Sequence, residues 1–211
     1  MFNPFRILGD VFHVVSILIL IHSIQTSRSA TGISLKTQSL YMLVYVTRYL
    51  DLLTFSFGSI YNVLMKLIFL SSTAYTIHIT KKYTKSMTQY VDDFNLLYVL
   101  VPSSILALLF NYKFTIFEIL WSFSLWLESV AILPQLYMLQ RQGQGDLLTV
   151  HYIFALGCYR ALYIPNWIYR YATESKFDYV SILTGIIQTL IYSDFFYIYY
   201  DKVIKSIKLP Q

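Results

Sequence analysis

The sequence predicts an all-α protein that crosses a membrane several times. Of its 211 residues, 56% are hydrophobic and only 13% are charged, whereas a soluble domain carries about 25% charged residues. Apolar stretches of about 20 residues, the length of a spanning helix, recur along the whole chain. A membrane β-barrel would instead show alternating segments of about ten residues. We therefore expect helices within a lipid bilayer, and no nucleic-acid partner.

Seven apolar segments are candidate spans with brief connections between them. They cover residues 5–25, 36–56, 59–79, 95–111, 114–139, 150–171 and 179–200. The first segment is expected to remain as a helix, because it carries charged residues and has no small-residue signal cleavage site. The longest connection, residues 80–94, is polar and too short for a soluble domain. Residues 1–211 are thus expected to form a single seven-helix membrane domain.

The lysines and arginines of the connections predict the orientation of these helices, because cytosolic loops are enriched in both. With the C-terminus in the cytosol, the cytosolic side receives Arg28, Lys36, Lys81, Lys82, Lys85, Arg141, Lys202, Lys205 and Lys208. The opposite side receives only Lys113 and Lys176. We therefore expect the N-terminus to face a lumen or the exterior.

A weak internal repeat appears when residues 32–51 are laid over residues 144–163. Both stretches begin with a small-residue turn, continue as an aromatic-rich helix and place one arginine, Arg48 or Arg160, near mid-depth. Parallel repeats of this kind occur in transporters. The expected organisation is two three-helix repeats (1–80 and 113–201) joined by the loop and fourth helix (81–112), with a cytosolic tail (202–211).

Ten charged side chains lie inside the apolar segments. They are Arg6, Arg48, Lys66, Arg160 and Arg170, and Asp10, Asp51, Glu118, Glu128 and Asp194. A charge at the bilayer centre costs roughly 2.5–3.5 kcal/mol even on lenient insertion scales. The balanced signs indicate internal pairing around a polar cavity, and they favour a ligand that is itself charged.

Helical spacing groups several of these charges on common faces. In the first segment, Arg6, Asp10 and His13 share one face. Histidine is the one side chain whose ordinary pKa allows charging between about pH 5 and 8, although a structural histidine is an equal alternative here. Arg48 and Asp51 are spaced so that they could pair with each other.

Two later segments add aromatic residues to the charges. Glu118, Trp121 and Glu128 lie on one stripe, where Glu118 and the Trp121 ring would suit a cationic group; an interfacial tryptophan is the alternative. Arginine forks match carboxylates bidentately, so the stripe of the sixth segment indicates an acidic ligand. This stripe is Arg160, Tyr163, Trp167 and Arg170.

Motifs of enzymes and metal sites do not occur in the sequence. There is no HExxH, GxSxG, P-loop or GxGxxG motif, and no histidine–cysteine cluster with metal-ligand spacing. The single cysteine, Cys158, lies in an apolar stretch as a packing residue. We expect no catalysis, no cofactor and no metal.

Several motifs resemble the KDEL/HDEL receptors, the endoplasmic-reticulum protein retention receptors. They are Asn3-Pro4-Phe5-Arg6, Thr47-Arg48-Tyr49-Leu50-Asp51-Leu52, residues 126–136 (WLESVAILPQL), Tyr159-Arg160-Ala161-Leu162-Tyr163 and Ser193-Asp194-Phe195-Phe196-Tyr197. The likeness runs essentially end to end and is weakest at 80–112. Residues 159–171 and 192–200 are most similar to fungal members.

The resemblance implies a fold related to the PQ-loop and SWEET transporters, with seven helices in two repeats. Pro134-Gln135 is the PQ pair of the second repeat, and the first repeat has none. It also implies a function: pH-dependent binding of C-terminal HDEL- or KDEL-type signals of escaped lumenal proteins in the cis-Golgi, and their return to the endoplasmic reticulum in retrograde vesicles. Such signals are receptor-read addresses and not anchors.

Site residues follow from the resemblance together with the spacing. Those expected to bind the signal peptide are Arg6, Arg48, Tyr49, Asp51, Glu118, Trp121, Arg160, Tyr163, Trp167 and Arg170. Those expected to sense pH are His13, Glu128, Tyr159 and Arg160. The resemblance assigns Asp194 to retrograde transport and the tail lysines Lys202, Lys205 and Lys208 to coat proteins.

Two other functions remain open on the sequence. A PQ-loop-type transporter of small solutes would share the fold, but a neutral sugar does not need this density of charge. A seven-helix G-protein-coupled receptor is expected to have larger loops and a longer tail.

Overall fold

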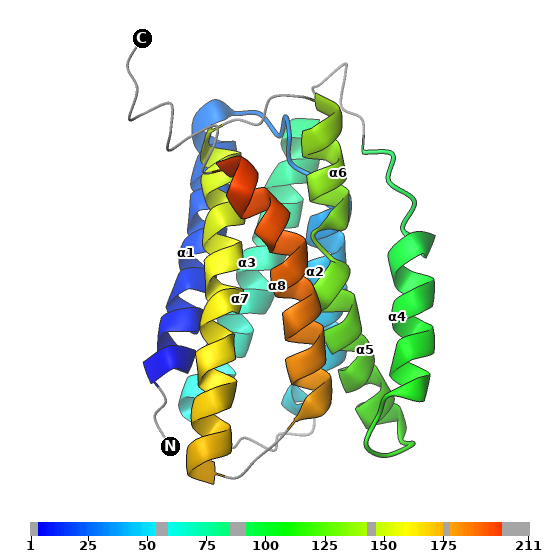
Figure 1. Ribbon diagram of the computed structural model, residues 1–211. Helices are drawn as coiled ribbons and strands as arrows, with labels where there is room; N and C mark the ends of the chain where they lie inside the picture. The colour runs from blue at the N-terminus through cyan, green and yellow to red at the C-terminus, as the bar shows by residue number, and fades with distance from the viewer. Residues whose placement is uncertain (1–3, 54–58, 85–91, 143–146, 175–177, 200–211) are drawn as a thin grey trace. The chain divides into compact units, whose positions relative to one another are not determined.

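The computed structural model of the protein describes residues 4–53, 59–84, 92–142, 147–174 and 178–199. Within these ranges the chain forms eight α-helices and one short 3-10 helix (Figure 1). The chain divides into two compact units. Unit 1 comprises residues 1–19 and 147–211, and unit 2 comprises residues 20–146. The first helix, α1 (Pro4–Ser27), contributes its beginning to unit 1 and its end to unit 2.

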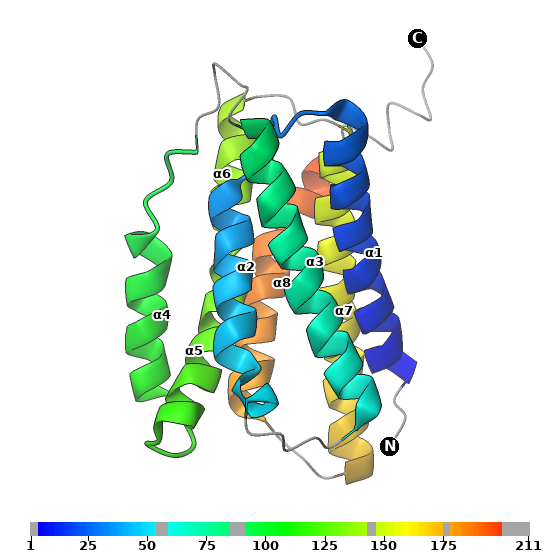
Figure 2. The same ribbon diagram turned by 180° about the vertical axis from the view of Figure 1, so that it is seen from behind.

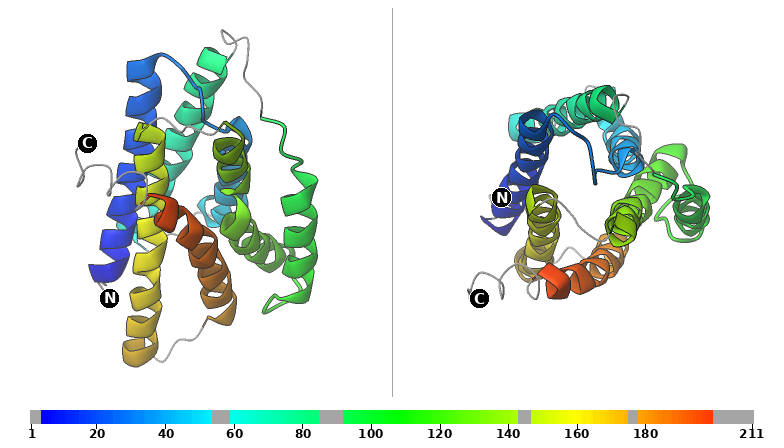
Figure 3. Two further views of the ribbon diagram at one scale, coloured as in Figure 1. Left: turned by 45° about the horizontal axis from the view of Figure 1, so that its top comes forward. Right: turned by 90° about the horizontal axis from the view of Figure 1, so that it is seen from above.

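Unit 1 contains α7 (Leu147–Glu174) and α8 (Tyr179–Tyr199), with the first part of α1 on the other side of α7 (Figure 3). Two glycines allow α7 and α8 to approach closely. Gly185 of α8 lies against the Trp167 indole, and a Cβ atom at Gly157 of α7 would lie 2.5 Å from the Phe196 ring. Small residues at such contacts are typical of helices packed within membranes.

Unit 2 contains α2 (Leu35–Arg48), the 3-10 helix η1 (Leu50–Leu52), α3 (Ile60–Thr84), α4 (Leu97–Leu109), α5 (Ile116–Val130) and α6 (Leu133–Gln142). The longer helices form a row in the order α3, α2, α5, α4 (Figures 2 and 3). The end of α1 joins this unit where the Gln25 amide donates a 2.7 Å hydrogen bond to the Tyr75 hydroxyl of α3.

The beginning of α2 is held by side chains from distant parts of unit 2. The N–H of Ser34, the residue that caps α2, donates to the side-chain oxygen of Gln135 at 2.8 Å. The N–H of Lys36 donates to the Asp92 carboxylate at 3.0 Å. A helix start leaves such N–H groups without partners inside the helix. These bonds satisfy them and fix the helix that carries Arg48 at its other end.

The prediction of a helical membrane protein is confirmed. Among the described residues, four helical stretches are long and apolar enough to cross a membrane: Pro4–Ser27, Ile60–Thr84, Ile116–Arg141 and Tyr179–Tyr197. A shorter apolar helix is α4. The count of seven spans and the two three-helix repeats stay predictions.

One of the predicted boundaries is wrong. Helix α2 ends at Arg48, although the sequence predicted a helix to residue 56, and the 3-10 helix η1 follows it. The predicted span 114–139 corresponds to the apolar stretch Ile116–Arg141, which is divided into two helices, α5 and α6, at residues 131–132. Pro134 lies in the first turn of α6, where its missing N–H costs no helical hydrogen bond. The break therefore falls where proline is tolerated.

Candidate functional site

The described site residues fall into two groups, one in each unit. Unit 2 holds Arg48, Tyr49, Asp51, Glu118, Trp121 and Glu128. Unit 1 holds Arg6, His13, Tyr159, Arg160, Tyr163, Trp167 and Arg170. The structure does not describe the residues predicted for transport. Lys202, Lys205 and Lys208 and the side chain of Asp194 lie outside the described residues.

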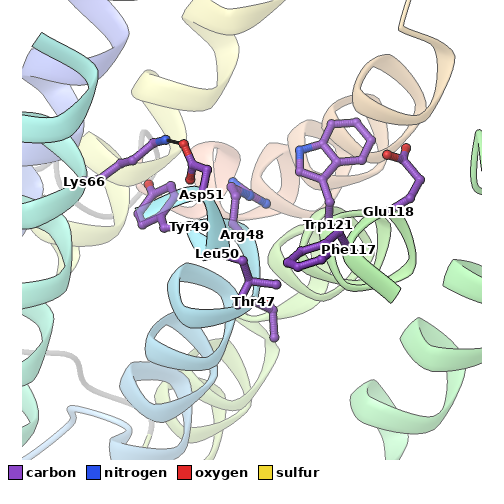
Figure 4. Close-up of a pocket in the computed structure, with 9 residues that line it drawn as sticks. All are labelled: Thr47, Arg48, Tyr49, Leu50, Asp51, Lys66, Phe117, Glu118 and Trp121. Carbon is purple, nitrogen blue, oxygen red and sulfur yellow. Dashed lines mark hydrogen bonds and ion pairs between the residues drawn. The ribbon is translucent and has the colours of Figure 1, made fainter. Parts of the chain in front are cut away.

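Unit 2 contains a pocket of about 570 Å³, a volume within the range of ligand sites. It is lined by Thr47, Arg48, Tyr49, Leu50, Asp51, Lys66, Phe117, Glu118 and Trp121 (Figure 4). The end of α2 and η1 supply one wall, the beginning of α5 supplies another, and α3 contributes its lysine. All five of the signal-binding residues predicted in unit 2 line this one pocket.

The α5 wall is built by local sequence. Thr115 caps α5, and its hydroxyl accepts a hydrogen bond from the Glu118 N–H at 3.4 Å, the interaction expected of a Thr-x-x-Glu start. Trp121 follows Glu118 by three residues, so both side chains lie on one face. Figure 4 shows the two projecting together from α5. The predicted acidic and aromatic corner is therefore present in the pocket.

Arg48 is the most constrained charge of the pocket. Its Nη1 lies 2.5 Å from the carboxylate of Glu128. Its Nε and Nη2 donate 3.0 Å hydrogen bonds to the hydroxyl and the carbonyl oxygen of Ser124. Because several donors of one guanidinium fork are engaged by groups of α5, the arginine is held in a fixed orientation.

Lys66 is a site residue to which the sequence pattern gave no binding role. It was counted among the buried charges, but no role in binding was assigned to it. In the structure its ammonium group forms an ion pair with Asp51 and lies 5.6 Å from the centre of the Tyr49 ring. Arg48 and Asp51, which the spacing suggested as a pair, thus have partners on α5 and α3.

Charges are unevenly distributed around the pocket. Arg48 and Lys66 bring positive charge to one part of it, and Lys66 shares that charge with Asp51. Glu118 and the Trp121 ring lie at the other side (Figure 4). Such a pocket suits a ligand with carboxylates along its length and a cation at one end.

In unit 1, α1 and α7 meet through polar side chains. The Tyr163 hydroxyl donates a 2.8 Å hydrogen bond to the Asp10 carboxylate, whose other oxygen lies 3.9 Å from Arg6. Gly9 makes this approach possible, because a Cβ atom there would lie 2.9 Å from the Tyr163 ring. Arg6 and Asp10, which the spacing placed on one face, thus form an ion pair that is anchored to α7.

His13 lies one turn further along α1 and is buried. Its ring stacks on Tyr159 with centroids 4.2 Å apart and an interplanar angle of 10°. The Arg160 guanidinium lies 5.3 Å and 5.9 Å from the ring centres of Tyr159 and Tyr163. Three of the four residues that the resemblance assigned to pH sensing, His13, Tyr159 and Arg160, are thus in one cluster, and the fourth, Glu128, belongs to unit 2.

The aromatic stripe of α7 continues beyond this cluster. The Tyr163 and Trp167 rings are 6.3 Å apart, and Arg170 follows one turn later, partly buried. Asn166, on the same helix, is 3% exposed and was not predicted. The sequence did contain a signal for it, because an asparagine inside an apolar helix, among arginine and aromatic residues, is an unusual polar group.

The chemistry of these groups is that of binding. Among the described residues, no cluster of histidine, cysteine, aspartate or glutamate could hold a metal ion. The two groups combine guanidinium, ammonium and carboxylate charges with aromatic faces inside apolar helices. Such groups are suited to binding a charged ligand.

Comparison with known proteins identifies the family. A family model described as ER lumen protein retaining receptor matches residues 29–170. The ER lumen protein-retaining receptor of Kluyveromyces lactis is 57% identical, over 100% of both chains. That of Saccharomyces cerevisiae is 56% identical over 99% of this chain and 100% of its own. The ER lumen protein-retaining receptor 3 of Xenopus laevis is 50% identical over 98% and 97%.

The chain belongs to the family of ER lumen protein-retaining receptors. The predicted resemblance is confirmed, fungal relatives included. This is a family of receptors and not of enzymes, and none of these relatives supports the transporter alternative.

Proposed function

We propose that the chain is a pH-dependent receptor for the C-terminal HDEL- or KDEL-type signal of escaped lumenal proteins. It binds them in the Golgi and returns them to the endoplasmic reticulum in retrograde vesicles. Retention of lumenal proteins is what the names of the relatives state. The observation that carries the proposal is the unit 2 pocket, with its basic part and its acidic, aromatic corner.

The signal and the pocket have complementary charges. An Asp-Glu-Leu ending brings three negative charges, counting the terminal carboxylate. Arg48 offers a fork that matches a carboxylate, and Lys66 adds a second positive group. The first signal residue, when it is histidine or lysine, is a cation that Glu118 and the Trp121 face suit. Arg6, Arg160 and Arg170 of unit 1 complete the proposed signal-binding arginines.

The present contacts of Arg48 suggest how affinity is limited. Its guanidinium already holds Glu128, so a signal carboxylate that binds Arg48 competes with a carboxylate of the protein. Protonation of His13 at acidic pH adds positive charge to the receptor. A receptor with more positive charge binds the anionic signal more tightly and releases it less readily.

The location of the chain follows from the same proposal. It is a multi-pass membrane protein, and we place it in the endoplasmic reticulum and cis-Golgi, with the N-terminus in the lumen and the C-terminus in the cytosol. Asp194 and the tail lysines would then serve retrograde transport, the lysines by contacting coat proteins. The excess of lysine and arginine in the connections assigned to the cytosol supports this orientation.

A binding measurement tests the function directly. The purified chain in nanodiscs is titrated with a fluorescent peptide ending in HDEL at about pH 5.5 and 7.5, which bracket the titration of an ordinary histidine. We expect saturable binding in acid, weak binding near neutrality, and none for the same peptide with an amidated C-terminus. Equal binding of the amidated peptide, or no binding at either pH, would contradict the proposal.

A further inference from the structure

Gln188 of α8 is a buried amide with an unusual environment. Its side chain is completely enclosed, with 0% exposure. Neither its oxygen nor its nitrogen has a hydrogen-bond partner among the residues that the structure describes. Gln135 is equally buried, yet its oxygen accepts from the Ser34 N–H and its nitrogen donates to the Gly32 carbonyl oxygen. Within the described ranges, both polar side-chain atoms of Gln188 thus lack a partner, whereas both of Gln135 have one.

The neighbours of Gln188 on its own helix do not supply a partner. Thr184, Gln188 and Tyr192 follow one another at intervals of four residues and form one buried stripe of α8. The Thr184 hydroxyl donates to the Val180 carbonyl oxygen at 2.9 Å, within its own helix. On this stripe of α8, the Thr184 hydroxyl has a hydrogen-bond partner and the Gln188 amide has none in the part of the chain that the structure describes.

The register of α7 and α8 places this amide at the same level as a group of predicted site residues on α7. Two close contacts fix the register: Gly185 against Trp167 and Tyr192 against Gly157. Because the helices run in opposite directions, Gln188 lies between these contacts, at the level of the α7 turn that begins at Arg160. That turn belongs to the cluster of His13, Tyr159 and Arg160.

An unpaired amide inside a membrane protein is costly, and buried water molecules are the usual partners of such groups. Water also restores hydrogen bonds around prolines in membrane helices, and α7 carries Pro165 in its interior at this level. We propose that Gln188 binds an internal water molecule that links the cluster of His13, Tyr159 and Arg160 to α8 by hydrogen bonds. Gln188 is then a positioning residue of the pH response, and its pH effect rests on the proposed function.

The charged groups around His13 determine the direction of the effect. On α1 they are Asp10, which favours a positive imidazole, and Arg6; on α7 they are Arg160, which disfavours it, and the hydroxyls of Tyr159 and Tyr163. The bridging water accepts a hydrogen bond from the protonated ring and donates one to the amide oxygen. Removing the Gln188 amide destabilises the protonated form of His13. Binding of the signal then requires a lower pH.

The test compares Gln188→Met, which keeps the length of the side chain without the amide, with Thr184→Val, which alters the same stripe one turn away. Thermal unfolding of the full-length receptor without peptide is measured first. We expect Gln188→Met to unfold at a lower temperature than the wild type, because it loses a satisfied hydrogen-bonding group. A higher unfolding temperature would show that the amide was unpaired and would overturn the proposal, whatever ligand the receptor binds.

The second readout is the pH profile of binding by the HDEL peptide. The midpoint of Gln188→Met should move to lower pH by roughly half a unit, the effect of one lost hydrogen bond, while Thr184→Val keeps the wild-type midpoint. An unchanged midpoint in Gln188→Met overturns the link to pH. If that variant does not fold, an experimental structure of the wild type decides, because density for a water at the amide supports the proposal and its lack refutes it. Failure of the wild type to bind the peptide would refute the proposed function alone.

Discussion

The carboxylate of Glu128 lies 2.5 Å from the guanidinium group of Arg48 and is largely removed from solvent, with 2% of its side chain exposed against 19% for the arginine. Ser124 accepts two hydrogen bonds from the same guanidinium. The arginine proposed to hold the signal therefore already holds an anion that belongs to the protein. Stability and binding should both depend on this pair.

The pair can be tested by its coupling in stability. Removing one partner of a buried ion pair typically costs about 3–5 kcal/mol, because the other charge is left uncompensated. We expect Glu128→Gln to lower the free energy of unfolding of the peptide-free receptor, and Glu128→Gln with Arg48→Met to recover most of the loss. The measurement is a double-mutant cycle of thermal unfolding. Additive effects of the two substitutions would show that the pair is not coupled.

Binding of the signal should depend on Arg48 itself. Arg48→Ala leaves a carboxylate of the peptide without its arginine partner, and truncating one partner of such a pair costs about 2–5 kcal/mol, or at least thirtyfold in affinity. Titration with HDEL peptide in acid measures this loss. Arg141→Ala is the matched control, because Arg141 pairs with Asp93 and is exposed. If the two variants bind the HDEL peptide with equal affinity, Arg48 does not take part in binding.

The first residue of the signal should be selected chiefly by Glu118. Asp51 is neutralised by Lys66, whereas Glu118 lines the pocket beside Trp121. Since specificity is a difference between two affinities, Glu118→Gln should reduce the preference for HDEL and KDEL over DDEL peptides more than Asp51→Asn does. Competition binding with the three peptides gives the ratios. If Asp51→Asn has the larger effect, the cation is bound near η1 instead.

The pH response should require a titratable ring at position 13. Protonation of His13 adds a positive charge, so affinity for the anionic signal rises as the pH falls, and binding takes up a proton. His13→Ala should flatten the affinity profile between about pH 5.5 and 7.5, with the weak affinity of the neutral form at every pH. Peptide titrations across this range provide the profile.

A second substitution separates the charge of His13 from its packing. His13→Phe keeps a ring to stack on Tyr159 and cannot be protonated, so it should flatten the profile in the same way as His13→Ala. A His13→Phe receptor that still binds tightly in acid and releases near neutrality would move the sensor to another group, of which Glu128 is the first candidate.

Return to the endoplasmic reticulum should require the tail lysines. Replacing Lys202, Lys205 and Lys208 by serine removes the positive charges proposed to contact the coat, without touching either group of binding residues. We expect the variant to bind HDEL peptide normally and to accumulate in the Golgi, as seen by fluorescence microscopy of a tagged receptor. Normal return would leave these lysines as ordinary cytosolic flanking charge.

The parts of the site that follow helical periodicity were predictable from the sequence. Arg6 and Asp10 are spaced to pair and do so, and Glu118 and Trp121 share a face as expected. Local capping rules also fit, since Thr115 begins the helix that carries Glu118. These features depend on residues within one or two turns of each other, where the geometry of the helix is known in advance.

Pairs between helices were not predictable in the same way. The partner of Arg48 is Glu128 on α5, and the partner of Asp51 is Lys66 on α3. No periodicity relates residues on different helices, so the sequence could indicate only that balanced charges pair somewhere. The end of α2 at Arg48 was also missed, because the hydrophobic residues continue past it without a glycine or proline to mark the boundary.

The bonds at the beginning of α2 have a mechanical consequence for its far end. A helix of 14 residues is about 20 Å long, and Gln135 and Asp92 hold the end opposite Arg48. A tilt of roughly 6° about the held end carries Arg48 through about 2 Å at that length, a displacement that would break its 2.5 Å contact with Glu128. A small rotation of α2 about its held beginning is therefore enough to form or break the ion pair between Arg48 and Glu128 at its other end.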